Sequence, residues 1–168
     1  MGETLSDPHG VEAGGTIKGM GLLPMDTVFA RKKTRTRVEG SFSQLTGAFA
    51  KLSDTALEGY EIHMGETTYE PGAAVFSTIA ETAGTHNGKG SSANGCQYQN
   101  AAGSYVHGIF DEKLVSEGIV SAILKQKGYD TLQIEGKDWN SYKEEQYDQL
   151  ADILRESLDM KAIYKMME

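Results

Sequence analysis

Two histidines stand in contexts that suit proton transfer or polar binding. His107 ends an apolar segment and directly precedes Gly108. Because glycine lets a substrate approach the backbone closely, this position suits a general base. His63 follows Glu61 by two residues, and in a strand both side chains point to one face. Such a pair could orient the imidazole or bind the polar end of a small ligand. On spacing alone, a structural or surface histidine is the commoner case at both positions.

Cysteine usage and metal-ligand spacing narrow the chemistry further. Cys96 is the only cysteine, so no internal disulfide can form, which fits a reducing compartment. A single cysteine together with histidines could form a Cys–His nucleophile pair. The sequence has no Cys-x-x-Cys and no histidines four residues apart, and we therefore predict no metal site. It also has no phosphate loop of the Gly-x-x-x-x-Gly-Lys-Ser/Thr type.

Composition excludes several classes of function. The 168 residues suit about one domain, with 39% hydrophobic and 24% charged residues, as in a soluble globular protein. The net charge of −8 makes nucleic acid an unfavourable partner. No apolar run reaches the roughly 20 residues that a membrane span needs. The first residues lack the basic and apolar regions of a secretory signal. We therefore predict a cytoplasmic protein with no membrane and no nucleic-acid partner.

The elements that must position these residues are strands first and helices afterwards. Threonine and arginine alternate over residues 31–38, which predicts a strand with one solvated basic face; an anionic-ligand patch is the alternative, and an exposed strand is favoured. The pairs Asn87-Gly88 and Asn94-Gly95 are turn signals. Further strands are predicted at residues 59–65, 75–79, 96–100 and 104–108.

Helical spacing begins after residue 110. Asp111 is a candidate cap for a helix over residues 114–123, and Gly128 a candidate stop. A second helix is predicted from the capping-box pattern that starts at Ser141, with an apolar stripe formed by Tyr147, Leu150, Ala151, Leu154 and Leu158. We assign residues 1–128 to one domain. Residues 129–168 are assigned to a connector and a C-terminal amphipathic helix that packs on the same domain.

Three segments resemble a known family. Gly59-Tyr60-Glu61-Ile62-His63-Met64-Gly65 is similar to a strand signature of cobyric acid synthases. Tyr105-Val106-His107-Gly108-Ile109-Phe110-Asp111 is similar to the segment that carries their catalytic histidine. Gly21-Leu22-Leu23-Pro24 resembles an earlier segment of the same family. The segments occur in family order, and the resemblance covers residues 1 to about 125. The chain thus resembles the C-terminal part of the family's glutamine amidotransferase domain.

The resemblance implies both a fold and an activity. The implied fold class is α/β, a partial class I glutamine amidotransferase-like domain with short strands and a helical C-terminus. The implied function is a part in cobalamin biosynthesis, the glutamine- and ATP-dependent amidation of corrin side-chain carboxylates. In the family, a cysteine activated by a histidine hydrolyses glutamine, and ammonia passes to a separate ATP-using domain. The mapping makes His107 that catalytic histidine and assigns Glu61 and His63 to substrate binding.

The sequence also departs from the family pattern. The family nucleophile sits in a Gly-x-Cys-Gly-Gly elbow, which we expect to precede Met1, with residues 1–5 as the tail of the elbow helix. Cys96 does not fit the strand-to-helix turn of an elbow, and we interpret it as a small core residue. We therefore expect the chain alone to be inactive and to bind no cofactor. ATP and magnesium would be used by an N-terminal synthetase domain, which is the expected partner.

Two alternatives to this function remain. One is the amidotransferase subunit that acts on a cell-wall lipid intermediate, which has similar strand and histidine motifs. The other is a catalytically inactive remnant that serves as a binding module. Because a fragment leaves sheet edges uncovered, self-association through those edges is a further expectation.

Overall fold

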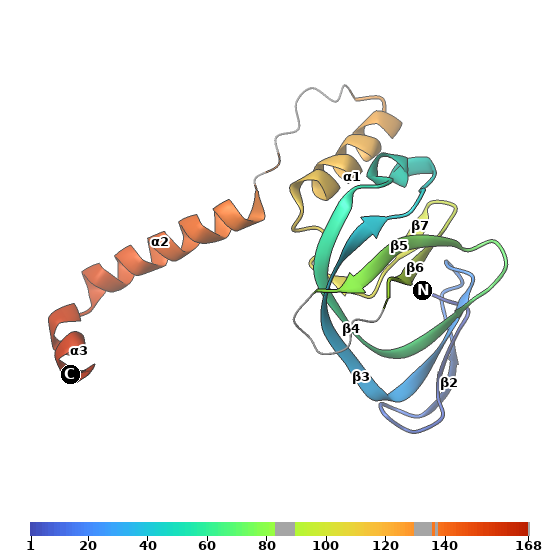
Figure 1. The fold of residues 1–168 in the computed structure, drawn as a ribbon, viewed down its shortest axis with the longest axis horizontal. Helices are drawn as coiled ribbons and strands as arrows, with labels where there is room; N and C mark the ends of the chain where they lie inside the picture. The colour runs from blue at the N-terminus through green and yellow to red at the C-terminus, as the bar shows by residue number, and fades with distance from the viewer. Residues whose placement is uncertain (83–89, 130–135, 137, 168) are drawn as a thin grey trace.

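The chain folds as one mixed sheet followed by helices (Figure 1). The computed structural model describes residues 1–82, 90–129, 136 and 138–167. The strands in these ranges are β1 (Thr4–Asp7), β2 (Gly15–Lys18), β3 (Met25–Phe42), β4 (Ala56–Tyr69), β5 (Ala74–Glu81), β6 (Ser92–Tyr98), β7 (Ala101–Gly103) and β8 (Val106–His107). The helices are the 3₁₀ helix η1 (Gly47–Leu52) and the α-helices α1 (Lys113–Gln126), α2 (Trp139–Ser157) and α3 (Met160–Met167). The α/β class predicted from sequence is confirmed.

Two long strands, β3 and β4, form the centre of the sheet. They pair antiparallel along most of their length, with a register break between Phe29 and Thr34. The second half of β3 also pairs with β5, and the sheet continues through β6 to β7. The prediction of short strands is wrong here, because β3 has 18 residues and β4 has 14. The basic residues 31–33 lie within this break in register.

The first residues form a strand and not the predicted helix tail. β1 pairs parallel to β3 and antiparallel to β2. The Glu3 N–H also donates to the Met25 carbonyl (2.8 Å), and the Gly19 N–H donates to the Glu3 carbonyl (2.7 Å). The segment lacks helix breakers, but its backbone groups pair with strands on both sides and it therefore becomes a strand.

The hydrophobic core lies between the sheet, η1 and α1. Phe42 and Phe76 meet edge to face, with ring centroids 5.2 Å apart, and Val115 of α1 is fully buried. A Cβ at Gly118 would lie 2.7 Å from Leu52, so the glycine lets α1 approach η1 closely. α1 therefore covers the end of the sheet that carries β8.

The observed ends of the helices agree only in part with those predicted from the sequence. Glu112, and not Asp111, is the N-cap of α1, because the Asp111 N–H donates to the Gly108 carbonyl in the preceding turn. The stop at Gly128 is confirmed, with φ of 78°. α2 begins earlier than predicted, because Asp138 is its cap and accepts from the Ser141 N–H at 2.8 Å. The Asn87-Gly88 turn lies outside the described residues.

α2 does not pack on the sheet. Figure 1 shows it projecting away from the strands, and none of its residues is buried. Leu150 is 52% exposed and Leu154 is 43% exposed, although both belong to the predicted apolar stripe. The expected packing of this helix on the domain is thus not seen, and the division at residue 128 stays a prediction. Among the described residues, no helix is long and apolar enough to cross a membrane.

Candidate active site

His107 is the last residue of β8 and is exposed at the surface. β8 pairs with β4, where His107 lies opposite Tyr60 and Val106 lies opposite Glu61. A Cβ at Gly59 would lie 2.2 Å from the His107 carbonyl oxygen, so this glycine is required for the close approach of the two strands. Gly108 follows with φ of 85°, which turns the chain sharply toward α1. His107 thus stands at a strand end between two glycines, Gly59 on the paired strand and Gly108 next in the chain.

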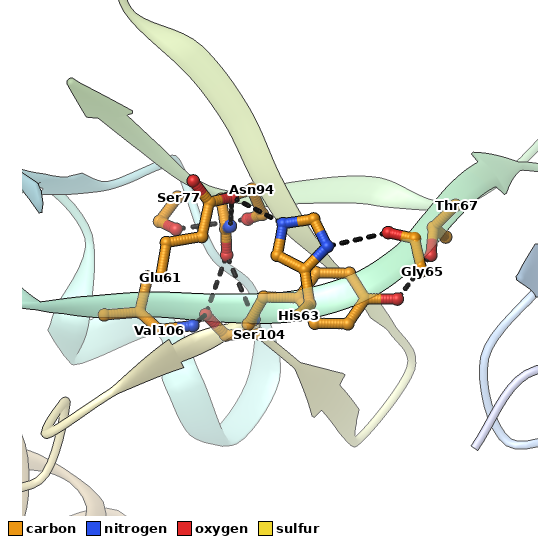
Figure 2. Close-up of polar contacts among 9 residues, drawn as sticks. Glu61, His63, Gly65, Thr67, Ser77, Asn94, Ser104 and Val106 are labelled. Atoms are coloured by element: carbon orange, nitrogen blue, oxygen red, sulfur yellow. Dashed lines mark hydrogen bonds and ion pairs between the residues drawn. The ribbon is translucent and has the colours of Figure 1, made fainter. Parts of the chain in front are cut away.

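Glu61 and His63 form a second polar group on β4. His63 Nε2 lies 3.2 Å from Glu61 Oε1, and His63 Nδ1 lies 2.7 Å from the Gly65 carbonyl oxygen (Figure 2). Both side chains are mostly shielded, with exposures of 19% for His63 and 18% for Glu61. The ring of Tyr105 stacks on His63 with centroids 4.3 Å apart. The imidazole is therefore held in one orientation by contacts on both its edge and its face.

The structure brings Glu61 and His63 together but places His107 apart from them. Residues opposite each other in an antiparallel pair share one face of the sheet. His107 therefore shares a face with Tyr60, while Glu61, the next residue on β4, points to the other face. The predicted pairing of Glu61 with His63 is confirmed as a contact. The catalytic role of His107 and the substrate-binding roles of Glu61 and His63 stay predictions.

Asn94 is the functional candidate that sequence reasoning missed. It lies inside β6 and is only 2% exposed, so the expected Asn94-Gly95 turn is wrong. Its Nδ2 donates to Glu61 Oε1 at 3.0 Å, and its Oδ1 accepts from Ser104 Oγ at 2.8 Å (Figure 2). The ladders that β6 forms with β5 and β7 override the local turn preference of Asn-Gly. The one sequence signal is the adjacent Gly95, because a glycine inside a strand pattern can indicate a bulge and not a turn.

An open cavity of about 650 Å³ lies beside this network. Its wall is largely apolar and includes Met25, Phe29 and Ile62, while His63, Ser104 and Tyr105 contribute polar groups. His107 is not among the lining residues. The apolar wall and the few polar groups are typical of a surface that another segment or a small ligand covers.

Cys96 is buried in the core, as predicted. Its side chain is 1% exposed and its Sγ lies 3.9 Å from Met25 Sδ. Burial raises the pKa of the Cys96 thiol, so little of the nucleophilic thiolate forms near neutral pH. Within the described ranges, no group of three or more His, Cys, Asp or Glu side chains is placed to hold a metal ion.

Comparison with known proteins defines the class of protein. Residues 1–115 match the CobB/CobQ-like glutamine amidotransferase domain, and the chain belongs to this family. This match contains the Glu61–His63 pair, Asn94 and His107. It confirms the resemblance inferred from the sequence motifs.

Two curated relatives of the chain are cobyric acid synthases. The chain is 47% identical over 169 residues to the cobyric acid synthase of Ruminiclostridium cellulolyticum, covering 99% of this chain and 32% of that protein. It is 45% identical over 176 residues to the cobyric acid synthase of Lachnoclostridium phytofermentans, covering 100% of this chain and 34% of that protein. The chain thus spans about a third of the length of these relatives.

Proposed function

We propose that this chain supplies the histidine side of a glutaminase site in a cobyric acid synthase of cobalamin biosynthesis. The observation that carries the proposal is the position of His107. It ends a short strand, is exposed to solvent and is followed by a glycine turn, inside the segment that matches the amidotransferase family. The relatives named above support cobyric acid synthase over the cell-wall enzyme.

The chemistry assigned to His107 is proton transfer. A cysteine thiolate attacks the glutamine amide carbonyl and forms a tetrahedral intermediate, and backbone N–H groups hold the oxyanion. His107 takes the thiol proton and then gives it to the leaving ammonia. The glutamyl thioester that remains on the cysteine is hydrolysed by water, which releases glutamate and regenerates the thiol. An exposed imidazole at a strand end suits this role, because a partner that carries the cysteine can reach it. Ammonia would then amidate the corrin side-chain carboxylates.

The other reactants are assigned outside these residues. ATP and magnesium would be used by an N-terminal synthetase domain, which is the proposed partner. Among the described residues, no group of three or more His, Cys, Asp or Glu side chains is placed to hold a metal ion, and the sequence carries no phosphate-loop motif. We further propose that the chain alone does not hydrolyse glutamine, because its only cysteine is the buried Cys96.

Complementation tests the proposal. The chain is mixed with a separately produced N-terminal part of the R. cellulolyticum relative, and ammonia release from glutamine is measured. We expect activity only in the mixture. We expect His107→Ala to lower this activity about a hundredfold or more, as for loss of a general acid–base group. His9→Ala is the matched control, since His9 is an exposed histidine in the turn after β1.

Three results would contradict the proposal. Activity of the chain alone that disappears when Cys96 is alkylated would show a different nucleophile. Full activity of the His107→Ala mixture would show that His107 has no catalytic role. Absence of activity in every mixture would favour the inactive remnant that acts as a binding module.

A further inference from the structure

We propose that Asn94 is a positioning residue that fixes the place of His107. This inference rests on the proposed function for the role of His107, but its structural part can be tested without it. Asn94 lies on β6 and is 2% exposed. A buried amide must have hydrogen-bond partners, because an unsatisfied one costs free energy. Its partners are on β4 and on the segment between β7 and β8.

The first arm of the network joins Asn94 to β4. Asn94 Nδ2 donates to Glu61 Oε1 at 3.0 Å, and the same oxygen lies 3.2 Å from His63 Nε2 (Figure 2). The Asn94 carbonyl oxygen of the backbone accepts from Ser77 Oγ on β5 at 3.1 Å. Asn94 is therefore held by hydrogen bonds from β4 and from β5, in addition to its contacts with the segment that leads to His107.

The second arm leads to His107. Asn94 Oδ1 accepts from Ser104 Oγ at 2.8 Å and from the Tyr105 N–H at 3.3 Å. The Ser104 hydroxyl in turn accepts from the Val106 N–H at 3.0 Å. His107 is the next residue. Two hydrogen bonds in series, joined at the Ser104 hydroxyl, thus run from a buried amide to the residue that precedes His107.

These two arms close a ring around β8. Val106 lies opposite Glu61 in the pairing of β8 with β4, so Glu61, Asn94, Ser104 and Val106 form a closed circuit. β8 has only two residues, and a strand this short has few ladder hydrogen bonds of its own. The ring supplies the missing constraint. Removing Asn94 should therefore loosen β8 and displace the His107 imidazole.

Hydrogen exchange and NMR of the whole chain test the structural part. In Asn94→Ala and Ser104→Ala we expect the Val106 amide to exchange about tenfold faster, as for loss of a net hydrogen bond, and the His107 ring signals to shift. Ser104→Thr keeps the hydroxyl and should restore both values. Asn100→Ala is the matched control, since Asn100 is exposed in the turn between β6 and β7. The Phe42 amide, which donates to Thr55, reports on global unfolding.

Several results would overturn the inference. It fails if Val106 exchange and the His107 signals stay unchanged in both alanine variants. It also fails if Phe42 and Val106 accelerate by the same factor, because Asn94 would then stabilise the fold as a whole. If Asn94→Ala does not fold, Ser104→Ala alone decides, since Ser104 is only partly buried.

Kinetics of the complemented mixture test the link to catalysis. A misplaced acid–base group lowers turnover more than binding, so we expect Asn94→Ala and Ser104→Ala to lower kcat about tenfold to a hundredfold with KM for glutamine within about twofold. Ser104→Thr should recover most of kcat, and Asn100→Ala should not change it. Unchanged kcat in both alanine variants, with His107→Ala inactive, overturns the positioning role. A fully active His107→Ala mixture instead overturns the proposed function, and the exchange data still decide whether Asn94 orders β8.

Discussion

At the scale of single residues, two glutamates on β4 differ in burial and therefore in their expected contribution to stability. Glu61 is 18% exposed and serves both His63 and Asn94 through one oxygen atom. Glu58 is 54% exposed and forms an ion pair with Arg37 at 3.3 Å. Removing a group whose buried hydrogen-bond partners are then left unsatisfied costs more stability than removing one member of an exposed ion pair. The two positions therefore offer a matched comparison on one strand.

We expect Glu61→Ala to lower the free energy of unfolding by about 1–3 kcal/mol, because the buried Asn94 amide loses its acceptor. Glu58→Ala, which changes the net charge equally, should cost about 0–1 kcal/mol. Urea denaturation followed by circular dichroism measures both values. Equal losses in the two variants would show that the Glu61 network adds nothing beyond the charge.

At the scale of elements, the contact between β4 and β8 depends on one glycine. A Cβ at Gly59 would lie 2.2 Å from the His107 carbonyl oxygen, which is backbone and cannot move aside cheaply. We expect Gly59→Ala to separate the strands and to lower the free energy of unfolding by about 1–3 kcal/mol, as for overpacking. Gly90→Ala is the control, because nothing lies within 4 Å of its added Cβ. A similar stability for both variants in urea denaturation would contradict the close packing of β8.

The turn between β1 and β2 gives a prediction about pH. Burial by itself raises the pKa of Asp7, but hydrogen bonds from the backbone N–H groups of Glu12, Val11, Gly14 and His9 lower it by more, and the net pKa lies below the usual 3.8. A lowered pKa means that the carboxylate stabilises the fold above pH 3.8 and that this stability is lost as the pH falls through the lowered value.

We therefore expect Asp7→Asn to lower the Tm at neutral pH, because an amide oxygen cannot replace both carboxylate oxygens as acceptors of the turn. The gap in Tm between wild type and Asp7→Asn should narrow as the pH falls from about 5 to about 2. Asp152→Asn, on the exposed side of α2, provides the control. A gap that stays constant over this range would contradict the role of the carboxylate.

Local patterns predicted the elements that carry His107, Glu61 and His63, and they failed where distant strands decide. Alternating side chains between Gly59 and Gly65 indicated a strand, and this segment is the middle of the longer β4. No local sequence pattern indicates that Asn94 is buried. Its hydrogen bonds go to residues 33 positions earlier and 10 positions later. The prediction of a helix tail at residues 1–5 was wrong for the same reason, because pairing with β3 and β2 determines the structure of this segment.

At the scale of the whole molecule, the relation of the C-terminal helices to the sheet is open to a direct test. Sequence predicts that the stripe of α2 packs on the domain, whereas the structure shows no buried residue in α2 or α3. Within the described residues, the segment that leads to α2 contacts α1 at Gly136, whose N–H donates to Glu117 Oε1 at 2.7 Å. Burial of a single leucine stabilises a fold by about 1.5–3 kcal/mol, so the two arrangements differ measurably.

We expect a chain that ends at Gly128 to keep the free energy of unfolding within about 1 kcal/mol of the full chain, because α2 adds almost no buried area. In the full chain, Leu150→Glu and Gln149→Glu should have equal effects within about 0.5 kcal/mol, as for two surface substitutions. These neighbours on α2 gain the same charge and differ only in the face they occupy. Urea denaturation measures all three variants. A loss of several kcal/mol in the shortened chain, together with a larger cost for Leu150→Glu than for Gln149→Glu, would instead show that the apolar stripe of α2 folds back onto the domain.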